Sequence, residues 1–146
     1  MKNYEHVIAA LNGLIETCRD AEEGLRAAAN RVGEEEAHGA LKRFAEQRAS
    51  FADELELQVR LLGGQADSSG EEADDARRGW MSIRSAEVDG DREILTETER
   101  SDDAVRQRFE EVLSQELPPH IGTIVQRQWS EIREAHTRLK SLRKGQ

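Results

Sequence analysis

The sequence predicts an all-α protein: a four-helix bundle with helix directions up, down, down and up, and a short crossover helix between the second and third. Apolar residues recur every three or four positions through four long segments, which is the period of an amphipathic helix. The prolines are adjacent, at Pro118 and Pro119, so long helices are possible elsewhere. No alternation of apolar and polar residues favours strands.

The whole chain, residues 1–146, is expected to form one domain. Only a few residues separate the helices of each long pair, so these helices should be antiparallel neighbours. A polar, turn-forming stretch precedes the crossover helix, and the proline pair opens the last helix. The expected helices span 3–32, 34–62, 71–87, 90–115 and 119–143.

Two antiparallel pairs joined by one long crossover define the ferritin-like topology. The helix over 71–87 would be about 25 Å long at 1.5 Å per residue. That length returns the chain along much of the bundle, which makes the second and third long helices parallel.

Composition limits the possible partners. The net charge of -9 argues against electrostatic binding of nucleic acid and against anionic membrane surfaces. No apolar run is long enough to span a membrane, and the N-terminus lacks the continuous apolar stretch of a signal peptide, so a cytoplasmic protein is expected. Cys18 is the only cysteine and falls on an apolar stripe, which predicts a buried structural thiol.

Each long segment loses its apolar stripe near the middle. The interruptions are Glu22, Arg48, Asp102 and Gln128, and His136 follows the last of them. Burying such groups is costly unless they pair with one another or hold a metal. The sequence therefore predicts a polar layer inside the bundle.

Hairpin geometry places these groups at similar heights. The first turn brings Glu22 level with Arg48, and the second brings Glu99 beside His136. Asp102 then lies level with Arg133. All four helices offer polar groups within about one turn of a common height.

One chemistry for this layer is a metal site for iron or manganese, with Glu22, Glu99, Asp102 and His136 as candidate ligands. Such bundle sites take a Glu from each of two helices and a Glu-x-x-His pair from each of the others. The second long helix offers no histidine at this level, and Arg133 stands three residues before His136. An arginine is permanently charged and is no metal ligand.

The favoured alternative is a salt-bridged layer without cofactor. Glu22 would pair with Arg48, and Asp102 or Glu99 with Arg133 or His136, while Gln128 completes the layer. Such pairs fix helix register more than they add stability. A third possibility is that these residues are solvated at helix edges. The favoured interpretation predicts a non-catalytic protein, either a stress-associated protein or an interaction module, rather than a metal-dependent oxidoreductase or iron-handling protein.

Two tryptophans suggest contacts. Trp80 is expected to pack the crossover helix against the bundle. Trp129 lies at the edge of its stripe, where it would suit contact with a partner chain. A homodimer that uses the crossover helix or Trp129 is therefore a candidate assembly.

Several segments, in this order, resemble a bacterial family of ferritin-like four-helix-bundle proteins known as a domain of unknown function (family 2383). The segments are LNGLIETCRDAEEGLRAAA, FAEQRASFADELELQVRLLGG, RRGWMSIRSA, ILTETERSDDAV, LPPHI and VQRQWSEIREAHTRLKSLR. The resemblance covers nearly the whole chain. It implies a ferritin-like bundle and no established activity.

The resemblance also implies a distant relation to rubrerythrins and ferritins, whose ligand pattern is partly met. Glu22 or Glu23 fits the first position, Glu99 the third and His136 the last. The second helix lacks its histidine, and Arg133 replaces the last glutamate. These departures argue against a ferroxidase or peroxidase activity.

Overall fold

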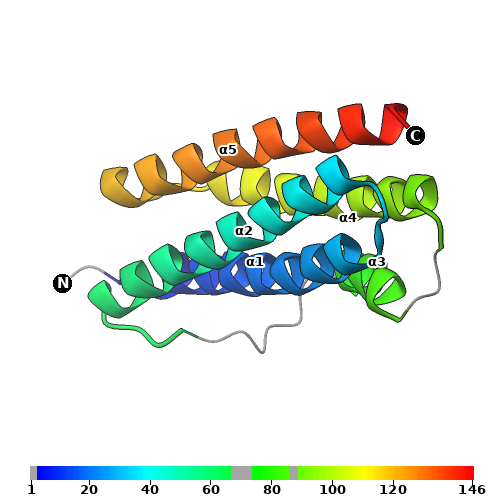
Figure 1. Cartoon of the computed structure of the whole chain (residues 1–146). Helices are drawn as coiled ribbons and strands as arrows, with labels where there is room; N and C mark the ends of the chain where they lie inside the picture. The colour runs from blue at the N-terminus through cyan, green and yellow to red at the C-terminus, as the bar shows by residue number, and fades with distance from the viewer. Residues whose placement is uncertain (1–2, 67–73, 86–88) are drawn as a thin grey trace.

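The computed structural model describes residues 3–66, 74–85 and 89–146, and over these ranges it contains five helices and no strand (Figure 1). The helices are α1 (Glu5–Arg31), α2 (Glu35–Leu61), α3 (Asp74–Arg84), α4 (Asp91–Leu113) and α5 (Pro119–Lys144). The predicted all-α helical bundle is confirmed. Within the described ranges, no helix is long and apolar enough to cross a membrane.

Helix ends follow local chemistry. The Glu34 side chain caps α2 by accepting a hydrogen bond from the Ala37 amide at 2.5 Å. Gly63 follows α2 with φ of 88°, a conformation that glycine adopts at low cost. Pro118 and Pro119 open α5, where a missing amide hydrogen costs nothing.

The core lies where α1 meets α2 and α4, and where α4 meets α5. α2 and α4 lie diagonally across the bundle, because α2 packs against α1 and α5 while α4 packs against α1, α3 and α5. Each fully buried leucine or isoleucine contributes about 1.5–3 kcal/mol. The fully buried aliphatic side chains include Leu11, Leu14, Leu25, Leu41, Leu55, Ile94 and Leu95.

The two ends of the bundle show how the helices run. Asp91, the first residue of α4, accepts hydrogen bonds from the amides of Gly33 (2.8 Å) and Glu34 (2.9 Å), which connect α1 to α2. α4 therefore begins at the end of the bundle where α1 finishes and α2 begins. Figure 1 shows α5 returning beside α4 toward that same end.

Within the described residues, the crossover helix α3 ends at Arg84, before the predicted end at 87. It has 11 residues, about 16 Å at 1.5 Å per residue, and Ser85 forms a turn after it. The predicted positions 71–73 and 86–87 lie outside the described residues. α3 packs beside the second half of α1 and against α4, so this helix covers one end of the bundle rather than its length.

Trp80 holds α3 on the bundle, as predicted. Its side chain is 1% exposed and lies directly over Gly24 of α1. Ion pairs flank it, from Arg77 to Glu16 and from Arg84 to Glu23 at 3.0 Å. The absence of a side chain at Gly24 allows the indole to approach the α1 backbone.

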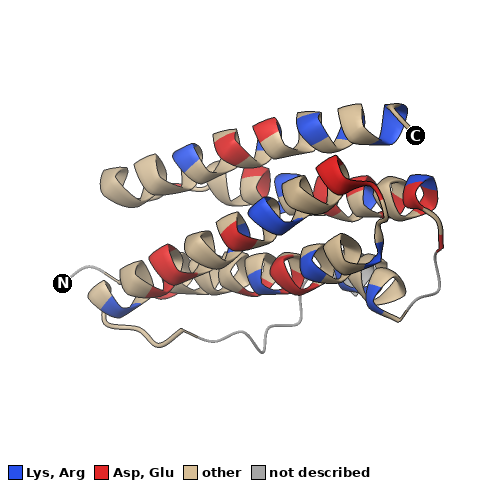
Figure 2. Cartoon of the chain, viewed as in Figure 1, with Lys and Arg blue, Asp and Glu red and all other residues tan. Residues whose placement is uncertain are grey.

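Acidic and basic residues alternate along the helices (Figure 2). Several of their ion pairs link neighbouring helices. Arg19 of α1 reaches Asp53 at 2.7 Å and Glu56 at 2.9 Å on α2. Arg138 of α5 reaches Glu36 of α2 at 2.9 Å. These ion pairs connect α2 to α1 and to α5. Exposed pairs of this kind add little to the free energy of unfolding.

Candidate functional site

The centre of the bundle holds a buried ion pair between Arg48 of α2 and Asp102 of α4. Both side chains are 0% exposed. Arg48 Nη1 contacts Asp102 Oδ1, and Nη2 lies 3.3 Å from Oδ2, so the guanidinium meets the carboxylate through both of its terminal nitrogens. The third guanidinium nitrogen, Nε, donates to Gln47 Oε1 at 3.1 Å. The long arginine side chain spans the diagonal of the bundle between α2 and α4.

This pair replaces the pairing expected for Arg48. Glu22 lies at the edge of α1, where it accepts hydrogen bonds from Arg26 at 3.1 Å and contacts Arg19 at 3.5 Å. The predicted pair between Glu22 and Arg48 is therefore wrong. Arg19, three residues before Glu22, and Arg26, four residues after it, lie on the same helix face and form ion pairs with its carboxylate.

His136 of α5 lies next to the central pair. Its Nδ1 atom is 4.0 Å from Asp102 Oδ2, too far for a hydrogen bond. That nitrogen is buried, and no described residue gives it a hydrogen-bond partner. Asp102 is therefore hydrogen-bonded to Arg48, whereas the His136 imidazole lies beside it without a hydrogen bond.

Gln128 is fully buried but lies apart from this pair. Its Nε2 donates to Glu54 Oε1 at 2.8 Å and to the Phe51 carbonyl at 3.4 Å, so it joins α5 to α2. Its Oε1 finds no partner among the residues described. The predicted polar layer therefore divides into two groups, one around Asp102 and one around Gln128.

Glu99 and Arg133 interact with residues outside the central pair. Glu99 lines the same surface pocket as His136, but its carboxylate forms an ion pair with Arg143 near the end of α5. Arg133 is exposed and stacks on the ring of Trp129, 4.8 Å from its centroid. The prediction that Arg133 belongs to the polar layer is wrong, because the side chain points to the surface, toward a residue one turn earlier on α5.

Cys18 of α1 is buried near the central pair. Burial raises the pKa of its thiol to about 12, and the nearby positive charge of Arg48 only partly offsets this rise. The thiol therefore stays protonated at neutral pH. It supplies no nucleophile and no thiolate ligand.

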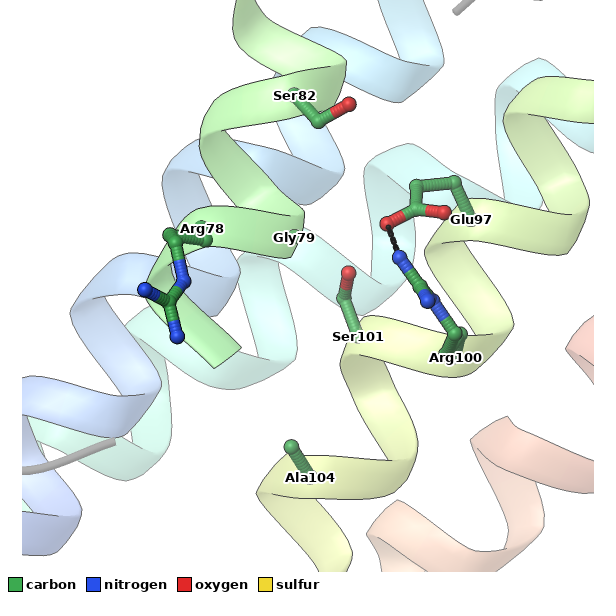
Figure 3. A pocket seen from close by; sticks show the side chains of 7 residues that line it. All are labelled: Arg78, Gly79, Ser82, Glu97, Arg100, Ser101 and Ala104. Atoms are coloured by element: carbon green, nitrogen blue, oxygen red, sulfur yellow. Dashed lines mark hydrogen bonds and ion pairs between the residues drawn. The ribbon is translucent and has the colours of Figure 1, made fainter. Parts of the chain in front are cut away.

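Two further polar residues of α4 are buried close to the pair: Thr98, which falls on the apolar stripe of its helix, and Ser101, which the sequence did not reveal. Thr98 is 0% exposed and donates to the Ile94 carbonyl at 2.7 Å, while Ser101 is 4% exposed and has no partner within the described structure. Ser101 borders a cavity between α3 and α4 (Figure 3). A serine at the edge of an apolar stripe does not change the helical period, so periodicity cannot show that Ser101 is buried. The position of the cavity depends on where α3 lies, which periodicity does not predict.

The candidate metal ligands do not fit a metal centre as the structure arranges them. Over the described ranges, no group of three or more histidine, cysteine, aspartate or glutamate side chains is placed to hold an ion. Instead, an arginine neutralises each predicted carboxylate ligand. The pairs are Glu22 with Arg26, Glu99 with Arg143 and Asp102 with Arg48. A guanidinium at each carboxylate repels a cation from it.

Fold and site together define an α-helical bundle whose polar centre is an ion pair. The family model for a domain of unknown function (DUF2383) matches residues 6–115, and the chain belongs to this family. The match includes both Arg48 and Asp102, whereas Gln128 and His136 lie beyond it. Comparison with curated proteins gives no match.

Proposed function

We propose that this protein is a ferritin-like bundle that acts by binding other molecules and carries out no chemistry at its centre. The observation that supports this proposal is the buried ion pair of Arg48 and Asp102. The pair lies in the bundle core between facing helices, which is where helical bundles build their polar sites. Each charge neutralises the other, so the centre presents no open carboxylate.

Three features support the ferritin-like arrangement. α1 and α2 form one antiparallel pair, and α4 and α5 form another. Asp91 ties the start of α4 to the turn between α1 and α2, which makes α2 and α4 parallel. α3 lies between the two pairs in sequence, as a crossover connection does.

The central side chains also favour a non-catalytic role. A general base needs an open position next to a substrate. Asp102 is fully buried and bonded to Arg48, and the Cys18 thiol is buried with a raised pKa. Neither group is accessible to a substrate, which leaves binding by the surfaces and cavities of the bundle.

Metal analysis tests this proposal. The protein is purified without chelator from cells supplied with iron and manganese, and its metal content is measured by mass spectrometry. We expect far less than one ion per chain, with no change in the variants Glu99→Ala and His136→Ala. Stoichiometric iron or manganese that is lost in both variants would overturn the proposal. Glu116→Ala, at a glutamate outside the bundle centre, serves as the matched control.

The second candidate is a metal-binding oxidoreductase or iron-handling protein. One observation favours it: His136 Nδ1 is buried, finds no partner in the described chain and faces Asp102 Oδ2 at 4.0 Å. An ion between these two atoms would need Arg48 to leave Asp102. The metal analysis separates this candidate from the first.

We also propose that the protein forms a homodimer through the crossover helix α3. Met81 of the crossover helix is 53% exposed, an apolar side chain on the element expected to face a partner. Trp129 is less available, because its Nε1 donates to Glu110 Oε2 at 3.2 Å and Arg133 covers its ring. Light scattering would give a mass of twice the chain for a dimer, and Met81→Glu should then return the mass to that of one chain.

A further inference from the structure

A pocket of about 290 Å³ lies beside the turn that joins α1 to α2. Its lining consists of Arg26, Ala29 and Asn30 from α1 and of His38 and Lys42 from α2. None of these five residues takes part in the central ion pair, and none carries a carboxylate. The pocket is therefore separate from the bundle centre and has a basic and polar lining.

A backbone carbonyl holds the His38 ring in one orientation. His38 Nδ1 lies 2.6 Å from the carbonyl oxygen of Ala29, in the last turn of α1. A carbonyl oxygen can only accept a hydrogen bond, so Nδ1 is the donor and carries the proton. In the neutral ring, Nε2 then has a free lone pair. His38 is exposed, and no described residue bonds to Nε2, so this nitrogen is available to a reagent.

Lys42 gives the pocket a positive charge that no described residue compensates. It is exposed and lies one turn after His38 on the same face of α2. Arg26 adds little net charge, because it already pairs with Glu22 at 3.1 Å. The Asn30 side chain is exposed and offers amide hydrogens. The pocket thus combines a nucleophilic nitrogen with a cation and an amide donor.

These charges determine what the Nε2 lone pair can accept. A metal ion is disfavoured, because the Lys42 ammonium repels it and no carboxylate in the lining offers a second ligand. An electrophile with negatively charged oxygens is favoured, because Lys42 attracts it and stabilises the charge that develops on it. The positive end of the α2 dipole, in the same first turn, acts in the same direction. A phosphoryl group meets these conditions.

We propose that His38 is a phosphoryl-acceptor site, and that its donor is a phosphoramidate, a compound with a nitrogen–phosphorus bond. Nε2 attacks the phosphorus and forms an Nε2–P bond, while the N–P bond of the donor breaks. The donor nitrogen is protonated, so it leaves as a neutral amine with the electron pair of the broken bond. The Nδ1 proton stays on the ring, hydrogen-bonded to Ala29. Lys42 and Asn30 donate to the phosphoryl oxygens.

Phosphoramidate itself is the probe. The folded, full-length protein is incubated with it at pH 8, and phosphohistidine is mapped by mass spectrometry without acid, which would break the new bond. We expect His38 to be labelled about tenfold faster than His6 and His120, which are exposed but have no ring hydrogen bond within the described chain. In urea the three rates should become equal. NMR should place the phosphorus on Nε2.

Variants test the role of the cation. Lys42→Gln should slow the labelling of His38 by about tenfold, the effect of losing one hydrogen bond from a charged donor. Arg43→Gln is the matched control, because Arg43 is an exposed cation at the next position of α2 but does not line the pocket. It should leave the rate unchanged.

Three results would overturn the proposal. His38 could be labelled no faster than His6 and His120, the phosphorus could be found on Nδ1, or Lys42→Gln and Arg43→Gln could slow labelling equally. None of these results bears on the metal analysis, because the pocket is separate from the central pair.

Discussion

Arg48 and Asp102 neutralise each other at the centre of this bundle, across the diagonal between α2 and α4. Both charges are fully buried, so each depends on the other for compensation. A buried pair of this kind adds little net stability but is strongly destabilising when one partner is removed. Its value lies in fixing the register of two helices that face each other across the diagonal of the bundle.

Gly24 should be intolerant of any larger residue, because Trp80 covers it. A Cβ atom at this position would lie 2.6 Å from Trp80 Cδ2. Gly24→Ala should therefore destabilise the protein by about 1–3 kcal/mol, the usual effect of overpacking. Urea unfolding measures the change, and Trp129→Phe leaves Trp80 as the fluorescent reporter.

Gly39→Ala is the matched control for this change. A Cβ atom at Gly39 of α2 meets only Arg43 Nη1, at 3.4 Å, and that side chain is flexible. Alanine should leave stability unchanged or raise it by up to about 1 kcal/mol, because it favours helix. Equal effects at Gly24 and Gly39 would contradict the close contact with Trp80.

The Cys18 thiol should resist alkylation in the folded protein. Burial raises its pKa from 9.0 to about 12, so almost no thiolate forms at pH 8. We expect iodoacetamide to label the native protein very slowly and the urea-unfolded protein rapidly. Labelling at equal rates in both states would contradict the buried position.

The same pKa shift predicts how stability changes at high pH. The folded state holds the Cys18 proton more tightly than the unfolded state does. The contribution of the protonated Cys18 thiol to the free energy of unfolding is therefore complete below pH 9.0 and is lost between pH 9.0 and about 12. Cys18→Ala should flatten the stability profile over this window, measured relative to the native chain. An unchanged slope would show that other groups cause the loss.

Asp91 should stabilise the end of the bundle. Its carboxylate accepts the amides of Gly33 and Glu34, and Asp91→Ala should cost about 1–3 kcal/mol because a charged acceptor is lost. Asp89→Ala is the control: Asp89 is fully exposed, and we expect less than about 0.5 kcal/mol. Thermal unfolding measures both variants, and a larger loss at Asp89 would argue against the predicted role of Asp91.

The pKa of Asp20 is raised, first by burial and second by repulsion from Glu23. A raised carboxyl pKa means that the folded state favours the protonated form. Its stabilising contribution is present at acidic pH, below the unfolded pKa, and is lost as the pH rises through the folded value. Asp20→Asn should therefore equal or slightly exceed the native chain in stability at pH 7, by less than about 1 kcal/mol. A clear loss of stability would instead show that the Arg77 contact at 3.3 Å dominates.

Periodicity predicted the helices and the burial of Arg48, Asp102 and Gln128, because each interrupts an apolar stripe. It did not predict partners, since a small change in helix rotation decides whether a side chain at a stripe edge faces the core. Glu22 turns outward to Arg19 and Arg26, and these partners were visible in the sequence at helical spacing.

Other features depend on tertiary placement. The diagonal reach of Arg48 to Asp102 requires the relative heights of two helices separated by the crossover. The α3–α4 cavity requires the position of α3, which Trp80 and Gly24 determine together. Neither relationship follows from the period of a single helix.

A double-mutant cycle on Arg48→Met and Asp102→Leu tests the central claim most directly. Free energies of unfolding are measured by urea titration for the native chain, both single variants and the double variant. We expect each single change to cost about 3–5 kcal/mol and the double variant to recover most of that loss, because no buried charge remains without its partner. Losses in the double variant that equal the sum of the two single losses would contradict the ion pair as the organising feature of the bundle centre.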